Sequence, residues 1–163
     1  MDEVKFWDVV QQAHNQSDGD MDEKCDAIKV AVANLSKEDA ISFSLFFDEM
    51  MDRAYSWELW AAAYIIYGGC SDDSFTDFRS SLISRGKKAF ESALKNPESL
   101  VDEEYDEEAW YYEGYQYAVS AGVEAAAGFV PDREKPYLEN PSGTAWEEDK
   151  VNELFPKLST KFA

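Results

Sequence analysis

The chain is 163 residues long, 45% hydrophobic and 15% aromatic, which predicts one folded domain with a packed core and excludes a disordered protein. Its formal net charge of −19, from 34 acidic and 15 basic residues, argues against binding to nucleic acid or to an anionic membrane surface, since both need clustered lysine and arginine. No apolar run approaches the roughly 18 residues of a membrane-spanning helix, so none is expected.

Two amphipathic helices are predicted near the N-terminus, over residues 3–14 and 21–35, because apolar side chains recur there at helical spacing. The polar stretch over residues 15–20 is expected to form the turn between them. Ser36 is suited to cap the start of a third helix. The buried face of this third helix is expected to carry Phe43, Phe47, Met50 and Ala54.

Residues 57–67 are apolar on nearly every side, which predicts a central helix that neighbours cover on most faces. The glycine pair at 68–69 can adopt the left-handed conformation that ends a helix. Ser71 is expected to cap the next helix, with Asp72 and Asp73 in its first turn, where the helix dipole stabilises negative charge.

Gly86 is expected to break this fifth helix, and a helical pattern continues over residues 87–94 until Pro97 stops it. A long sixth helix is predicted over residues 107–129, although its three glycines lower the helix propensity by ~1 kcal/mol each relative to alanine. These glycines are also candidates for close helix contacts.

A proline-punctuated extended arm is expected at residues 131–143, and a last short helix at 144–155, which Pro156 would end. No convincing strand periodicity and no internal repeat occurs in the sequence. The prediction is therefore one all-α domain of about six to eight helices, with a helical core over 3–130 and the arm and short helix in residues 131–163.

The central stretch, Phe47–Gly86, reads FDEMMDRAYSWELWAAAYIIYGGCSDDSFTDFRSSLISRG. It resembles a bacterial family catalogued as domain of unknown function family 4240. The continuation at Phe90–Leu100, the tail at Pro141–Phe162 and the Phe6-Trp7 pair are similar to that family as well. The resemblance implies a soluble bacterial domain, and it brings no activity, cofactor or catalytic residue.

The two cysteines, Cys25 and Cys70, form no CxxC motif, and the N-terminus has no secretory signal pattern. A cytoplasmic location with reduced, structural thiols is expected. Structural zinc needs four Cys or His ligands, and with His14 the chain has three such residues. No metal and no cofactor is therefore expected.

The first candidate site lies in residues 50–86 and just before them, where aromatic side chains, a helix break, acids and arginines occur together. The candidate binding residues are Glu49, Asp52, Arg53, Trp57, Trp60, Tyr64, Asp72, Asp73 and Arg79. A structural interpretation stands beside this one: the aspartates occupy helix starts, and the acids of the region form ion pairs with Arg53, Arg79 and Arg85.

The second candidate site is the run from Asp102 to Tyr117, in which aromatic residues alternate with carboxylates. Such a run can bind a basic peptide through charge and cation–π contacts. The structural alternative places Trp110, Tyr111 and Tyr115 in the core of the sixth helix, with the acids facing solvent.

These features predict a non-enzymatic binding or regulatory module that recognises a basic protein or peptide, and the charge also suits an immunity- or inhibitor-type protein. Two alternatives remain open. One is a hydrolase or transferase with a carboxylate acid/base site, in which Asp72 or Asp73 is the base and Arg79 or Arg85 stabilises charge. The other is a structural homo-oligomer, because the sequence leaves the oligomeric state undecided.

Overall fold

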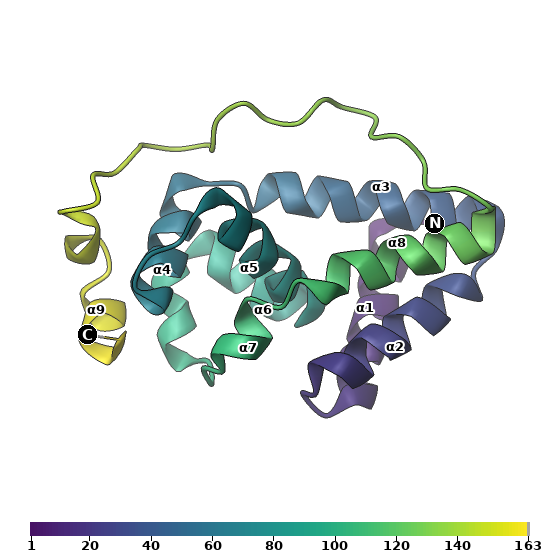
Figure 1. Cartoon of the computed structure of the whole chain (residues 1–163), viewed down its shortest axis with the longest axis horizontal. Coiled ribbons are helices and arrows are strands. Elements are labelled where there is room, and N and C mark those ends of the chain that lie inside the picture. Colours follow the sequence, from purple (N-terminus) through teal and green to yellow (C-terminus); the bar gives the residue numbers. More distant parts are fainter. Residues whose placement is uncertain (163) are drawn as a thin grey trace.

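The computed structural model describes residues 1–162, and all of the regular elements in that range are helices (Figure 1). The all-α prediction is confirmed. The elements are α1 (Glu3–Ser17), α2 (Met21–Ala33), α3 (Lys37–Arg53), α4 (Trp57–Tyr67), α5 (Asp72–Ser84), α6 (Lys87–Lys95), the 3-10 helix η1 (Pro97–Asp102), α7 (Glu107–Trp110), α8 (Gly114–Ala127), the 3-10 helix η2 (Val151–Glu153) and α9 (Pro156–Phe162).

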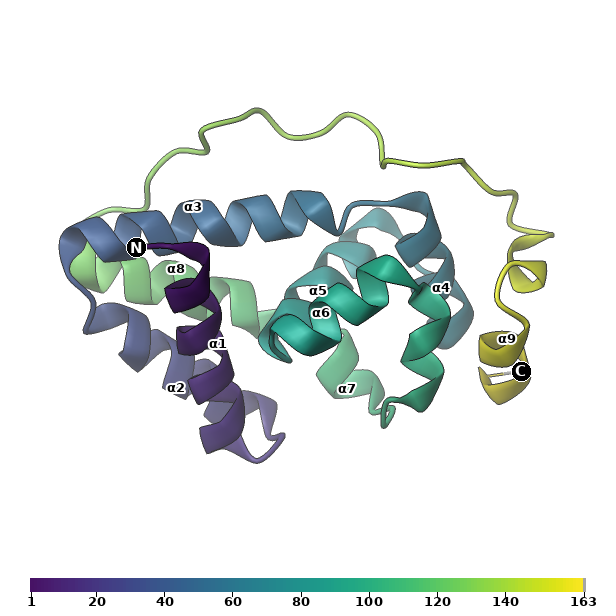
Figure 2. The same cartoon turned by 180° about the vertical axis from the view of Figure 1, so that it is seen from behind.

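The helices form two groups that share α3 as a long edge (Figures 1 and 2). At one end α2 packs along α8, α1 packs against α2, and α8 packs against α3. At the other end α5 contacts α6 and α7, while α4 contacts η1 and α9. The buried side chains of both groups form one continuous hydrophobic cluster.

Serine caps fix where several helices begin. The Oγ atoms of Ser36, Ser56 and Ser71 each accept a backbone N–H three residues ahead, at 3.1 Å. Such a cap stabilises a helix by about 1 kcal/mol. Gly68, with φ of 75°, ends α4, so the predicted bounds of the central helix are confirmed.

The predicted buried face of α3 is also confirmed, since Phe43, Phe47, Met50 and Ala54 are all buried. Six of the eleven residues of α4 are buried, and the helix lies against α5, η1, η2 and α9. A helix that is apolar nearly all round is therefore covered by neighbours from several parts of the chain.

The predicted long helix over residues 107–129 is wrong, because the chain breaks between α7 and α8. Tyr112 leaves the helical path: its backbone N–H donates to Ser81 Oγ at 3.1 Å and its hydroxyl bonds to Asp22. The ring of Tyr112 then lies against Gly114, where an added Cβ would meet it at 2.7 Å. Tertiary hydrogen bonds override the local helical pattern here.

Two boundaries also differ from the prediction. The first helix continues to Ser17 and takes up half of the expected turn. In the C-terminal region, the structure has only the short η2 within residues 144–155, and Pro156 begins α9 where it was expected to end a helix. Proline suits a first helical position because the N–H that it lacks has no helical partner there.

The segment from Gly128 to Lys150, here called the arm, contains no helix and passes over α3 to reach α9 at the far end (Figure 1). The predicted extended arm is therefore present. Among residues 1–162, no helix is both long enough and apolar enough to cross a membrane.

Candidate functional site

The first candidate residues do not form one site. Glu49 and Arg53 lie on α3, beside a surface groove of about 570 Å³. Arg53 pairs with Glu49 at 2.8 Å and with Glu3 at 3.0 Å, and all three side chains are partly exposed. The expected pairing of Arg53 with a neighbouring acid is confirmed, and at this exposure each such pair contributes little stability.

Asp52, one turn from Asp48 on the same helix, binds the arm. Its Oδ2 accepts from the guanidinium of Arg133 at 2.6 Å, and Asp48 lies 3.8 Å from that guanidinium. The ring of Tyr137 covers the same group, with the guanidinium carbon 4.2 Å from the ring centre. Burial raises the pKa of Asp48, and Arg133 opposes that rise.

Trp57, Trp60 and Tyr64 form an aromatic cluster on α4. The rings of Trp57 and Trp60 stack with centres 5.4 Å apart, and Trp146 of the arm packs edge-on against all three residues. The Nε1–H of Trp146 donates to the carbonyl of Trp57 at 2.6 Å, and that of Trp60 donates to the carbonyl of Cys70 at 2.9 Å. The arm therefore covers the predicted aromatic patch.

The polar residues of α5 take two different positions. Asp72 and Asp73 are exposed in the first turn, where Ser71 supplies the cap. Arg79 is 92% buried, since its relative exposure is 8%. These are the acids and the arginine that the enzyme hypothesis would use.

Arg79 is held by neutral groups. Its guanidinium donates to the carbonyl of Met51 at 2.8 Å and to Thr76 Oγ1 at 3.2 Å, and it lies 4.5 Å from the ring centre of Tyr55. The ion pairs of residues 1–162 do not include Arg79, so its expected ion pair is absent from them. Burial lowers the pKa of Arg79, and Asp72 opposes that change.

A cavity of about 370 Å³ brings part of the first candidate set together. It lies among α3, α5 and the arm, and its lining includes Asp52, Asp72 and Arg79. Arg133 and Tyr137 of the arm line it too. Asp73 and the tryptophans of α4 are not among the lining residues.

The second candidate run forms a shallow depression of about 530 Å³, here called the tyrosine–carboxylate cavity. Its lining residues are Tyr67, Asp106, Glu107, Glu108, Tyr111, Tyr112 and Glu113. All the charged members of this lining are acidic. The two rings of Tyr67 and Tyr111 stack with centres 4.4 Å apart, and the hydroxyl of Tyr111 donates to the carbonyl of Ala63 at 2.7 Å.

The structural alternative for this run holds for part of it, because Trp110 and Tyr115 are buried in the core. Tyr67, which lies far from the run in the sequence, was missed as a lining residue. Arg133 and Trp146 were missed as neighbours of the first candidate set. No local pattern marks these residues, because each reaches its place through contacts between distant parts of the chain.

The two thiols lie in environments that hold them protonated. Burial raises the pKa of Cys25 to about 11 and that of Cys70 to about 12, and nearby aspartates add to both shifts. A thiol with so high a pKa is a poor nucleophile at neutral pH. Within residues 1–162, no group of three or more His, Cys, Asp or Glu side chains is placed to hold a metal ion.

Comparison with known proteins gives one match. The model of a family described as "Protein of unknown function (DUF4240)" matches residues 1–124. That range includes all nine residues of the first candidate site and all residues of the tyrosine–carboxylate cavity, whereas the whole arm lies beyond it. Neither the curated proteins nor the solved structures give a match.

Proposed function

Because the chain belongs to the DUF4240 family, whose function is unknown, we propose a function from its own geometry: it is a cytosolic, non-enzymatic module that binds a basic segment of a protein partner. An inhibitor of a basic enzyme, of the immunity type, is one form of this function. The cytosolic part of the proposal rests on the two free cysteines.

The observation that carries the proposal is the composition of the tyrosine–carboxylate cavity. Four carboxylates and three tyrosines line it, and no lysine or arginine does. A cationic side chain placed there gains Coulomb attraction from several acids and a cation–π contact with a tyrosine face, which is worth ~0.5–1 kcal/mol at an exposed site. A shallow depression of this kind suits lysine or arginine side chains on a partner surface.

The charge of the whole molecule supports the same function. A net charge of −19 attracts a basic partner over distances near the Debye length and raises its association rate. The first candidate patch is less available, because Arg133 neutralises Asp52 and Trp146 covers the tryptophans of α4.

The test uses a fluorescein-labelled decapeptide of alternating lysine and glycine, titrated with the full chain and followed by fluorescence anisotropy. We expect the double variant Glu107→Gln/Glu108→Gln to bind the peptide about 5- to 30-fold more weakly, since each lost contact with an exposed charge is worth ~0.5–1 kcal/mol. Tyr67→Ala should weaken binding about 3-fold through the lost ring face.

The matched control is Glu148→Gln/Asp149→Asn, which removes the same charge from exposed positions on the arm. Its affinity should fall by less than about 2-fold, because only the long-range field changes. If the control and the cavity variant lose affinity equally, binding reflects net charge alone and the site is wrong. An affinity that does not fall between 0.05 and 0.5 M NaCl would contradict the electrostatic basis.

A further inference from the structure

Arg79 carries a buried positive charge, and no ion pair among residues 1–162 includes it. The residue is only 8% exposed, and its Nε is buried without a hydrogen-bond partner in the described chain. The guanidinium donates to the carbonyl of Met51 and to Thr76 Oγ1, which are both neutral groups. Because a buried charge is costly unless an opposite charge accompanies it, an anionic group is what this position lacks.

The guanidinium of Arg79 lies at the wall of the cavity of about 370 Å³ among α3, α5 and the arm, here called the Arg79 cavity. Met51 and Thr76, which accept its hydrogen bonds, line this cavity. Tyr55, whose ring centre lies 4.5 Å from the guanidinium carbon, lines it as well. Pockets that hold small molecules in proteins have volumes of roughly 300–1,000 Å³. A ligand in the cavity can therefore supply the missing negative charge.

The other charged residues of the lining leave one acid over. Arg133 pairs with Asp52 at 2.6 Å and with Asp48 at 3.8 Å, so these three side chains neutralise one another. Asp72, the remaining charged residue of the lining, takes part in no ion pair among residues 1–162. The Arg79 cavity thus has one unpaired positive and one unpaired negative side chain.

These two unpaired residues lie on one face of α5. Asp72, Thr76 and Arg79 are spaced at i, i+4 and i+7, so their side chains follow one another along the helix. Thr76 Oγ1 accepts from Arg79 at 3.2 Å and donates to the backbone carbonyl of Asp72 at 3.1 Å. Burial lowers the pKa of Arg79 and the charge of Asp72 opposes that change, which places the two charges near each other although they do not pair. A ligand that carries a carboxylate and an ammonium close together matches them.

The rest of the lining offers apolar surface. Phe47 and Met51 of α3 contribute buried side chains, and the arm contributes Leu138 and the ring of Tyr137. An apolar group placed beside these side chains is removed from water, which favours its binding. The cavity therefore combines a pair of opposite charges with apolar surface.

We propose that the Arg79 cavity binds a free α-amino acid with an apolar side chain, whose carboxylate bonds to Arg79 and whose ammonium faces Asp72. A planar carboxylate matches the forked N–H donors of a guanidinium. A ligand without net charge also escapes the repulsion that a protein of charge −19 exerts on anions. This inference does not depend on the proposed binding of a basic segment, because the Arg79 cavity and the tyrosine–carboxylate cavity share no lining residue.

The test titrates the full chain with two amino acids and their matched analogues by isothermal titration calorimetry. L-phenylalanine is compared with 3-phenylpropanoate, which lacks the ammonium, and with 2-phenylethylamine, which lacks the carboxylate. L-leucine is compared with 4-methylpentanoate and 3-methylbutylamine in the same way. We expect at least one of the two amino acids to bind, and its amine analogue to bind at least about 10-fold more weakly, since a hydrogen bond to a charged group is lost.

Two outcomes of these titrations would overturn the proposal. One is that neither amino acid binds at concentrations up to about 10 mM. The other is that the carboxylate analogue binds as tightly as its parent amino acid, because the ammonium would then have no partner in the cavity.

Arg79→Met tests the carboxylate contact, since it removes the charge and keeps a long apolar side chain. Its affinity for the amino acid should fall at least about 10-fold. The matched control is Arg53→Met, which removes the same charge from α3 outside the cavity lining and should change the affinity by less than about 2-fold. Equal losses in the two variants would show that Arg79 does not contact the ligand.

A second pair of variants keeps the test decisive if Arg79→Met fails to fold. Asp72→Asn should weaken the binding of the amino acid about 2- to 5-fold, since its partner is an exposed carboxylate, and should leave the carboxylate analogue bound at least as tightly as before. Asp73→Asn removes the same charge from the same helical turn, but Asp73 does not line the cavity, so the affinity should stay within about 1.5-fold. If both variants weaken the amino acid equally, Asp72 is not its partner and the proposal is wrong.

Discussion

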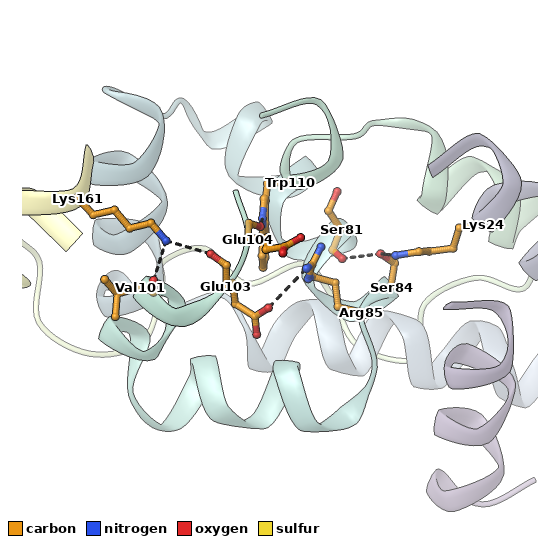
Figure 3. A network of polar contacts seen from close by, with 9 residues as sticks. All are labelled: Lys24, Ser81, Ser84, Arg85, Val101, Glu103, Glu104, Trp110 and Lys161. Carbon is orange, nitrogen blue, oxygen red and sulfur yellow. Dashed lines mark hydrogen bonds and ion pairs between the residues drawn. The ribbon is translucent and has the colours of Figure 1, made fainter. Parts of the chain in front are cut away.

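Lys24 is a basic side chain buried inside the protein. It is 99% buried on α2, since its relative exposure is 1%, and its Nζ lies 3.2 Å from Ser84 Oγ, which in turn donates to the carbonyl of Ser81 (Figure 3). Burial lowers the pKa of Lys24 from 10.5 to about 8, and the charge of Arg85 adds to this shift. A buried charged amine whose hydrogen-bond partner is a neutral hydroxyl reduces the stability of the fold at neutral pH.

We expect Lys24→Met to raise the free energy of unfolding by about 1–3 kcal/mol at pH 7. The unfolded chain binds the proton more tightly, so the penalty in the unmodified protein is complete below pH 8 and disappears as the pH rises through 10.5. The free energy of unfolding of the variant, measured in urea, should therefore exceed that of the unmodified protein by much less at pH 10.5 than at pH 7. Lys29→Met, at an exposed position on the same helix, should give no such pH-dependent difference.

His14 makes the fold sensitive to acid. Its Nδ1 is buried without a hydrogen-bond partner in the described chain, and burial, followed by the charges of Lys24 and Arg85, lowers its pKa from 6.5 to about 4. The unfolded chain therefore binds the proton first, and stability falls as the pH drops from 6.5 towards 4. The melting temperature of His14→Gln should fall less over this range than that of the unmodified protein. If the melting temperatures of the two proteins fall equally between pH 6.5 and pH 4, His14 is not the source of the acid sensitivity.

At the scale of elements, the contact between α2 and α8 depends on Gly122. A Cβ at this position would lie 2.8 Å from the carbonyl oxygen of Lys29 and 2.9 Å from Cβ of Val32. Neither is the flexible end of a side chain, so the helices would have to separate. The expectation that a glycine in this region marks a close helix contact is confirmed.

Gly122→Ala should lower the free energy of unfolding by about 1–3 kcal/mol, although alanine favours a helix over glycine by ~1 kcal/mol. The control is Ser120→Ala, at an exposed position on α8, which should be neutral or slightly stabilising. Urea unfolding measures both. A stabilised Gly122→Ala protein would mean that α2 and α8 are less tightly packed than the structure shows.

For the whole molecule, a net charge of −19 means that the folded chain repels itself. Raising NaCl from 0.02 to 0.5 M shortens the Debye length from roughly 20 Å to about 4 Å and should raise the free energy of unfolding, measured in urea. The same salt should weaken the binding of the basic decapeptide. Destabilisation by salt would show instead that the surface ion pairs outweigh the general repulsion.

The sequence by itself determined the fold class, the family and several of the residues at which helices begin and end. Ser36 and Ser71 cap helices where expected and Gly68 ends α4, because a cap or a stop acts within one turn of its own residue. The apolar face of α3 followed from periodicity for the same reason.

The tertiary structure alone decided the break at Tyr112 and the surroundings of both candidate sites. Tyr67 reaches the tyrosine–carboxylate cavity, Arg133 reaches α3, and Trp146 reaches α4, each across more than 40 residues of sequence. Such contacts depend on which surfaces meet once the helices pack, and no short-range pattern records that choice. These contacts explain why the acids and the tryptophans of residues 49–79, which are close in the sequence, have different neighbours in the structure. They also explain why the arm covers the tryptophans of α4.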